Sequence, residues 1–207
     1  SDLSYEEPPN GEPQKRLVEE VRFRYFDSEH LPEPLPPGQV DARALPYEQY
    51  KLAFTPGLID QTYNEDQLRV SPDTLLEAGY RQLPNDPRWW SPSGRALPDR
   101  SRFYLPTEFF DPFGNRAFAE YDAEVLLITR VEDAAHNVVW AQHDYRVLAP
   151  REVTDPNLNR SAVRFDALGM VVATAVMGKE GTQDGDTLDG PGGPTTELNY
   201  DLHRFHT

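Results

Sequence analysis

The stretch FFDPFGNRAFAEYDAEVLL, residues Phe109–Leu127, holds two features that are typical of tight turns between strands. The first is the segment Asp111–Asn115 (DPFGN). Here Asp can bind its own backbone two residues on, Pro presets φ, and Gly or Asn accepts a positive φ. The second is a ring followed by an acid, Tyr121-Asp122, six residues past the Asn. Together they predict two strands with a corner before each of them.

Both features recur at a fixed interval further along the chain. The first Asp stands at positions 111, 133 and 155, which are 22 residues apart, and the Asn and the ring-acid pair keep the same phase. Three landmarks in phase over three units predict an internal repeat rather than an ordinary β-meander whose turns share Asp and Pro. The first-corner residues are Asp111, Gly114, Asn115, Asp133, Asn137, Asp155 and Asn159. The second-corner residues are Tyr121, Asp122, His143, Asp144, Phe165, Asp166 and Gly169.

Each unit is expected to fold in the order turn, strand, turn, strand. The expected strands are Arg116–Tyr121, Leu126–Val131, Val138–His143, Arg146–Leu148 and Met170–Val176. Because His136 and Leu158 stand where the first unit has Gly114, we expect the positive φ to fall on the Asn of each corner. Such units predict a mainly β fold, with an antiparallel sheet built from β-hairpin repeats of 22 residues.

The end of the chain predicts a fourth unit displaced by an insertion. Tyr200-Asp201 is a further ring-acid pair, and residues 178–194 are rich in Gly and have no aromatic residue. We therefore expect a loop near 178–194 that leaves the edge of the repeats. The repeats as a whole are expected to occupy residues 106–207.

The N-terminal half predicts shorter elements between Pro-rich loops. Residues 1–15 are polar and acidic, and we expect a flexible lead-in followed by a β-rich region at 16–105. Alternating residues in Leu17–Phe26 predict a half-buried strand, with Val21, Phe23 and Tyr25 on one face and two arginines on the other. Residues 50–54 (YKLAF) predict a second strand.

A short helix is predicted near residues 71–79. Ser71 is a natural N-cap, Pro72 suits the first helical position, and Gly79 suits the stop. Residues 55–64 (TPGLIDQTYN) predict a further helical turn, and Leu31–Gly38 (LPEPLPPG) predicts an extended loop.

Composition excludes several classes of function. The chain has 207 residues, 20 of them Pro, a net charge of −15 and no Cys. Such a charge repels nucleic acid and anionic membranes, and without Cys there is neither a disulfide nor a thiolate site. No apolar run is long enough to predict insertion into a membrane. Since no initiator Met is present, we expect a piece of a longer protein.

The repeated units resemble the tyrosine-aspartate (YD) repeats of the Rhs family. More narrowly, DYRVLAPREVTDPNLNRSAVRFDALGMVVATAVMGK at Asp144–Lys179 resembles insecticidal toxin-complex B components and their Salmonella plasmid virulence relatives. The segments YKLAFTPGLI and WWSPSGR also fit, so that the resemblance covers residues 47–207. The middle unit departs from the pattern, with His143 in place of Tyr and neither Pro nor Gly at its first corner.

The resemblance implies a structural role rather than an enzymatic one. In that family the repeats form a strip of sheet that spirals into a hollow shell around a toxic C-terminal segment, and this chain would be one stretch of the wall. Its partners would be neighbouring repeats of the full-length chain and a toxin-complex subunit. It would be secreted or associated with the cell surface, and it would need no cofactor. The family's self-cleavage residues are not identifiable in this sequence.

Four other readings concern binding or catalysis. A carbohydrate-binding β module would use exposed rings, for which Trp89, Trp90 and Trp140 are the candidates, although a buried structural role is favoured for the adjacent pair. Residues 184–190 (DGDTLDG) resemble a calcium loop only in part, since the third Asp is one position late. His203 and His206 have no evident third zinc ligand. No pair of carboxylates has the spacing that would nominate a glycosidase site.

Overall fold

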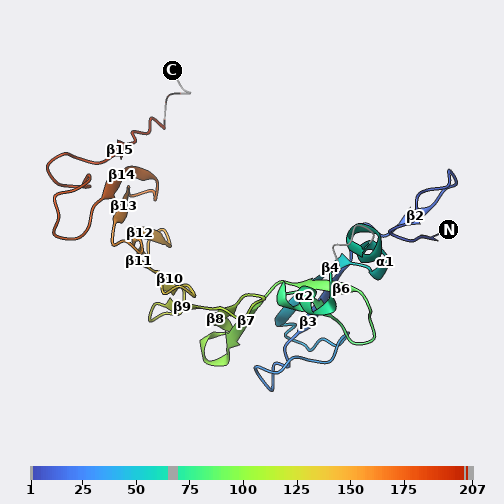
Figure 1. The fold of residues 1–207 in the computed structure, drawn as a ribbon. Helices are drawn as coiled ribbons and strands as arrows, with labels where there is room; N and C mark the ends of the chain where they lie inside the picture. The colour runs from blue at the N-terminus through green and yellow to red at the C-terminus, as the bar shows by residue number, and fades with distance from the viewer. Residues whose placement is uncertain (1, 65–69, 203, 205–207) are drawn as a thin grey trace. The chain divides into compact units, whose positions relative to one another are not determined.

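The computed structural model of the chain describes residues 2–64, 70–202 and 204 (Figure 1). The fold is mainly β, with antiparallel sheets of four and nine strands and a small parallel pair, β1 (Asp2–Leu3) and β2 (Lys15–Arg16). The chain divides into two compact units, residues 1–116 and 117–207. The finer division into lead-in, β-rich region and repeats remains a prediction.

The first unit contains the four-stranded sheet, in the order β3-β4-β6-β5. These strands are β3 (Val21–Tyr25), β4 (Pro46–Phe54), β5 (Arg81–Gln82) and β6 (Trp89–Pro92). Its core joins Trp89 of β6 to two buried residues, Ile59 and Leu75, which the short helices supply. The sheet of this unit is therefore anchored on one side by helical turns.

Three helical turns follow β4. They are α1 (Pro56–Ile59), the π-helical turn η1 (Asp60–Asn64) and α2 (Pro72–Glu77). The Ser71 hydroxyl accepts a hydrogen bond from the amide of Thr74 at 3.1 Å, and Gly79 has a φ of +90° just past the end. The helix predicted at 71–79 is confirmed, as is the turn that begins at Thr55, whose hydroxyl caps α1 at the amide of Leu58.

The strand predicted in Leu17–Phe26 is confirmed as β3, but its arginines make the aromatic contacts. The Arg22 guanidinium lies 4.4 Å from the ring of Trp90, and that of Arg24 lies 5.4 Å from the ring of Tyr47. Phe23, on the opposite face, is 54% exposed. A guanidinium can cover an aromatic face while it keeps its polar edge accessible, so alternation alone does not say which face is covered.

The hairpin of β7 (Arg95–Asp99) and β8 (Leu105–Phe110) also belongs to the first unit, with the 3-10 turn η2 (Arg100–Arg102) at its tip. Two consecutive residues past that turn, Phe103 and Tyr104, have left-handed φ angles of 56° and 62°. In the order of the nine-stranded sheet, each strand stands beside its neighbours along the chain.

The second unit is a series of antiparallel hairpins, which Figure 1 shows one after another from β9 to β14. The strands are β9 (Arg116–Tyr121), β10 (Ile128–Glu132), β11 (Val138–Asp144), β12 (Ala149–Thr154), β13 (Arg160–Phe165), β14 (Val171–Met177) and β15 (Thr196–Glu197). Residues 178–195 contain no helix or strand and make one isolated bridge, from Gly185 to Met177.

Two of the expected strands differ from the structure. Residues 146–148 are not a strand, because they form the turn between β11 and β12, where Leu148 has a φ of +53°. The strand expected from Leu126 begins only at Ile128, because Leu127 closes the preceding corner through a 2.9 Å hydrogen bond from the amide of Asp122 to its carbonyl. In both cases, residues that the apolar pattern predicted to be in strands belong to the turns that begin at Asp122 and Asp144.

The registers give the second unit two chemically different faces. Glu120, Arg130 and Glu132 share one face, where Arg130 bridges both acids at 2.7 and 2.5 Å. The opposite face has no charged residue at a paired position of β9 to β15, which are all described, and carries residues such as Ala119, Val139 and Val153. The paired positions of this sheet are therefore charged on one face and uncharged on the other.

Candidate functional site: the repeated corners and an arginine pocket

The first corners of the three units are the same turn. At Asp133 the carboxylate Oδ1 accepts from the amides of Ala135 and Asn137, at 2.8 and 2.9 Å, and the carbonyl accepts from the amide of His136 at 3.0 Å. The corners at Asp111 and Asp155 repeat every one of these bonds within 0.2 Å. The 22-residue spacing of the sequence thus corresponds to equivalent bends.

Positive φ does not fall on the Asn of these corners, so that expectation is wrong. The left-handed residues are those just before it, Gly114, His136 and Leu158, with φ of 88°, 63° and 67°. A three-residue hairpin loop is a type I turn followed by one left-handed residue, and the Asn comes next, directly before the first residue of the following strand. Histidine and leucine tolerate this backbone because the surrounding bonds fix it, at an expected cost of about 1–2 kcal/mol each.

The Asn side chains have a different task, which is to bind the Asp of the same corner. Asn115, Asn137 and Asn159 donate their Nδ2 to the second carboxylate oxygen, at 2.7, 2.8 and 3.2 Å. Each Asp is therefore held through both oxygens, one by the backbone and one by the amide. This pairing explains why Asp and Asn recur together four residues apart.

The hydrogen bonds at the three first corners favour the ionised form of the Asp side chains. The side-chain amide of the corner Asn, with backbone amides, holds the pKa of Asp111 and of Asp133 below its usual value. At Asp155 desolvation raises the pKa, but the backbone amide and the side chain of Asn159 outweigh it, and the net shift is again downward. A group with a lowered folded pKa contributes stability above its unfolded pKa and loses it as the pH falls through the folded value.

Replacing Asn137 with Ala is expected to lower the melting temperature by a few degrees at pH 7, because the charge-assisted bond to Asp133 is lost. The difference from the wild type should shrink as the pH falls through the lowered pKa of Asp133, because the carboxylate then becomes protonated. The matched control is Asn157→Ala, since the side chain of Asn157 makes no hydrogen bond within the described residues. Thermal melts of the three proteins at pH 7 and pH 3 test this, and a difference independent of pH would contradict it.

The second corners are less uniform. Asp166 repeats the first-corner pattern, with Met170 in the position of the Asn and Gly169 left-handed at a φ of 82°. At Asp122 and Asp144 the backbone bonds differ, and the left-handed residues are Val125 and Leu148. Of the ring residues, His143 and Phe165 are half-buried, as is Tyr121.

A side-chain hydrogen bond that the repeat pattern missed links two successive second corners. The Tyr145 hydroxyl donates to the Asp122 carboxylate at 2.6 Å, and this bond lowers the pKa of Asp122. Tyr145 follows Asp144 directly, so it stands 23 residues after Asp122. A search for Tyr on either side of each second-corner Asp would have found it.

Two of the three candidate sugar-stacking rings are unavailable. Trp89 is 6% exposed and Trp90 is fully buried, so neither can stack on a sugar, and the buried reading is confirmed. Trp140 is 41% exposed, on the charged face. Its role in binding carbohydrate stays a prediction.

The metal readings find no support among the residues that the structure describes. No group of three or more His, Asp or Glu side chains there could hold a metal ion. Asp189 of the proposed calcium loop instead pairs with Arg164 at 2.7 Å, and Asp186 accepts from the Thr195 hydroxyl at 2.5 Å. His203 and His206 lie outside the described residues.

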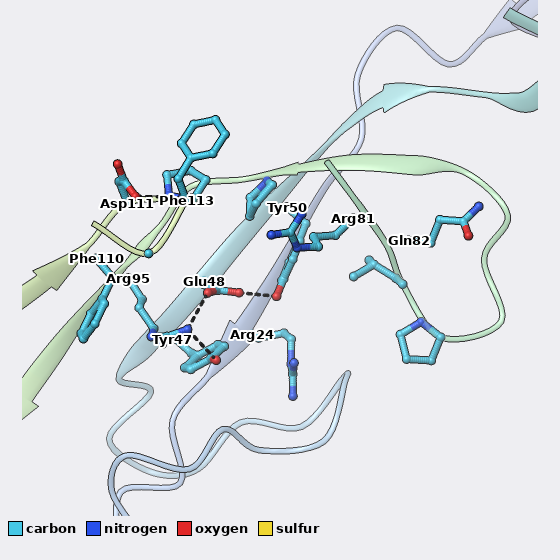
Figure 2. Close-up of a pocket in the computed structure, with 15 residues that line it drawn as sticks. Arg24, Tyr47, Glu48, Tyr50, Arg81, Gln82, Arg95, Phe110, Asp111 and Phe113 are labelled. Atoms are coloured by element: carbon cyan, nitrogen blue, oxygen red, sulfur yellow. Dashed lines mark hydrogen bonds and ion pairs between the residues drawn. The ribbon is translucent and has the colours of Figure 1, made fainter. Parts of the chain in front are cut away.

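A pocket of about 450 Å³ lies in the first unit (Figure 2). Its walls include four aromatic rings and three guanidinium groups, contributed by Tyr47, Tyr50, Phe110, Phe113, Arg24, Arg81 and Arg95. Glu48 occupies part of it, accepting from the Tyr50 hydroxyl and, at 3.2 Å, from Arg95. Burial raises the pKa of Tyr50, and the bond to Glu48 acts in the same direction, so the phenol remains a donor.

None of the helices in the described part of the chain is long and apolar enough to cross a membrane. Comparison with known families finds no matching family model and no matching curated protein. Solved structures do match, and they contain the proteins of a toxin complex.

The similarity to these structures covers most of the chain but little of theirs. A structure of TcdB2-TccC3-Cdc42 matches with a TM-score of 0.68 and 23% identity over 88% of this chain and 9% of the solved one. A structure of TcdB2-TccC3 matches with a TM-score of 0.64 and 22% identity over 75% of this chain and 8% of the solved one. A variant of the Photorhabdus luminescens Tc holotoxin pore matches with a TM-score of 0.64 and 22% identity over 76% of this chain and 8% of the solved one. The chain thus spans less than a tenth of the length of each solved chain, and it has the fold of a segment of the toxin-complex protein TcdB2-TccC3.

Proposed function

We propose that the chain is a structural segment of a larger Rhs-type toxin-complex protein, and that its YD-type hairpins form part of a β-sheet shell that encloses or presents a C-terminal toxin. The observation that carries the proposal is the succession of equivalent corners at Asp111, Asp133 and Asp155, in a chain that folds like a segment of TcdB2-TccC3. A unit that pairs only with its neighbours can be extended without limit, as a wall requires.

The two faces of the second unit support the same role. The charged residues at paired positions all lie on one face, so a wall built from such units would have inner and outer surfaces of different chemistry. Such a segment works by position and not by catalysis. Its partners would be the neighbouring repeats and a toxin-complex subunit, and the full protein would be secreted or held at the cell surface.

The complete reading frame gives the first test. We expect many further 22-residue units with Asp and Asn four residues apart, followed by a C-terminal segment of unrelated sequence. A frame that ends shortly after this chain, or that surrounds it with unrelated domains, would contradict the shell.

Protease protection in the full-length protein gives the second test. We expect the C-terminal segment to resist digestion while the shell is intact, and to become cleavable when two corners are removed together by Asp133→Ala and Asp155→Ala. The control is Asp184→Ala, which changes an exposed loop acid of the same charge. Equal and immediate digestion of the C-terminal segment in all three proteins would overturn enclosure.

A further inference from the structure

The pocket of the first unit holds two cationic groups that no described carboxylate balances. Arg95 is paired with Glu48 at 3.2 Å. In contrast, Arg24 donates to the carbonyl of Leu35 at 3.2 Å, and Arg81 donates to the carbonyls of Leu76 and Tyr80 at 3.1 and 2.8 Å. Neither has an ion-pair partner within residues 2–64, 70–202 and 204.

The carboxylates in the pocket wall are already engaged. Glu48 accepts from Tyr50 and Arg95, and Asp111 accepts from the amides of Phe113 and Asn115 and from the Asn115 side chain. The lining therefore keeps a local excess of positive charge on a chain whose net charge is −15. A ligand with a negative charge would meet a complementary site there.

Arg24 supplies a second, independent observation. Its Nε is buried and has no hydrogen-bond partner among the described residues. An unsatisfied buried donor is destabilising, and a ligand acceptor that displaced the neighbouring atoms would relieve it. The Arg24 guanidinium lies over the Tyr47 ring at 5.4 Å, which holds it in place before any ligand arrives.

Arg24 also stands at the junction of two cavities. A neighbouring space of about 290 Å³ shares Arg24, Tyr50, Leu83 and Pro84 with the larger pocket. The shared wall is aromatic and aliphatic apart from the guanidinium. A small inorganic anion would leave this apolar wall uncovered, whereas a peptide side chain would fill it.

We propose that this pocket binds a carboxylate carried by a peptide segment, with Arg81 as the group that receives it and Arg24 as a further positive charge in the pocket wall. A guanidinium offers parallel N–H donors that match the two oxygens of a carboxylate. The rings and prolines around them cover the neighbouring side chain of the same peptide. The site does not depend on the shell role, since every residue of it belongs to the first unit.

The probe is acetyl-Glu-Phe-amide, compared with acetyl-Gln-Phe-amide and with sodium acetate, and followed by the arginine Nε–H signals in 15N NMR spectra of the whole chain. We expect saturable shifts with the Glu peptide, including the Arg24 Nε–H signal, and at least tenfold weaker binding of the Gln peptide and of acetate. Equal affinity for the Glu and Gln peptides would overturn the carboxylate assignment. Equal affinity for acetate and the Glu peptide would overturn the peptide assignment.

Two matched substitutions distinguish binding in the pocket from non-specific attraction to positive charge on the chain. Arg81→Gln, at an exposed position, is expected to weaken the Glu peptide about tenfold, whereas Arg151→Gln makes the same charge change in the second unit and should have no effect. Arg24→Gln should also weaken binding, because it removes a positive charge from the pocket wall. If that variant does not fold, Arg81→Gln alone decides, because unchanged binding in it would refute the site.

Discussion

Replacing Trp90 with Ala is expected to destabilise the first unit by about 3–5 kcal/mol, which is the usual range for the loss of a buried aromatic side chain. Trp90 is fully buried, and its ring lies 4.4 Å from the guanidinium of Arg22 and 5.0 Å from that of Arg88. The change would leave a cavity and would also remove two cation–π contacts. Urea denaturation followed by circular dichroism measures the loss.

Two variants show which property of Trp90 matters. Trp140→Ala removes the same atoms from a ring that is 41% exposed, and it should cost about 1 kcal/mol or less. Trp90→Phe keeps a ring between the arginines and removes Nε1, which is buried without a partner among the described residues, so its cost should lie well below that of Trp90→Ala. Similar losses for Trp90→Ala and Trp140→Ala would show that the buried ring is not the anchor we infer.

Replacing Gly94 with Ala should cost about 3 kcal/mol or more, and lower the melting temperature by about 6 °C or more. Gly94 has a φ of +78°, and a Cβ there would overlap the carbonyl oxygen of Phe110. Backbone strain and a clash with main-chain atoms would act together, and a carbonyl in a paired strand cannot move aside cheaply.

Gly114→Ala is the matched control for this substitution. Its φ of +88° is similar, but a Cβ would meet nothing within 4 Å, so only the conformational cost of about 1 kcal/mol remains. Calorimetry of both variants separates strain from overlap. If both substitutions lower the free energy of unfolding by the same amount, Gly94 does not lie close to the Phe110 carbonyl in solution.

The sequence predicted the architecture well wherever polar residues define a corner. Asp, Asn and Ser act through hydrogen bonds to backbone a few residues away, so the first corners and the cap of α2 could be inferred from spacing alone. The registers followed from these corners, because a hairpin turn fixes which residues face each other. This is why β9 agrees with the strand expected at Arg116–Tyr121.

The two wrong predictions in the repeats, on positive φ and on the strand at 146–148, also have local physical causes. Positive φ was assigned to the Asn because a histidine and a leucine are poor candidates by propensity, yet the bonds around His136 and Leu158 impose it. The strand expected at 146–148 failed because an apolar pair inside a turn looks like a short strand.

The pocket could not be predicted from the sequence. Its arginines come from β3, β5 and β7, and no spacing rule joins residues that meet only through the pairing of distant strands. The covering of Trp90 by Arg22 was hidden for the same reason, since β3 and β6 both pair with β4 but lie far apart along the chain.

The pairing of each strand in the second unit with the next one along the chain has a consequence for how the protein is made. Every contact that completes a hairpin lies within a few tens of residues, so closing it requires only a short loop and should be fast. Each hairpin can form as it leaves the ribosome, without waiting for a distant segment to be synthesised. A long protein assembled in this way would fold from its N-terminal end, and interrupted synthesis would leave the completed hairpins folded.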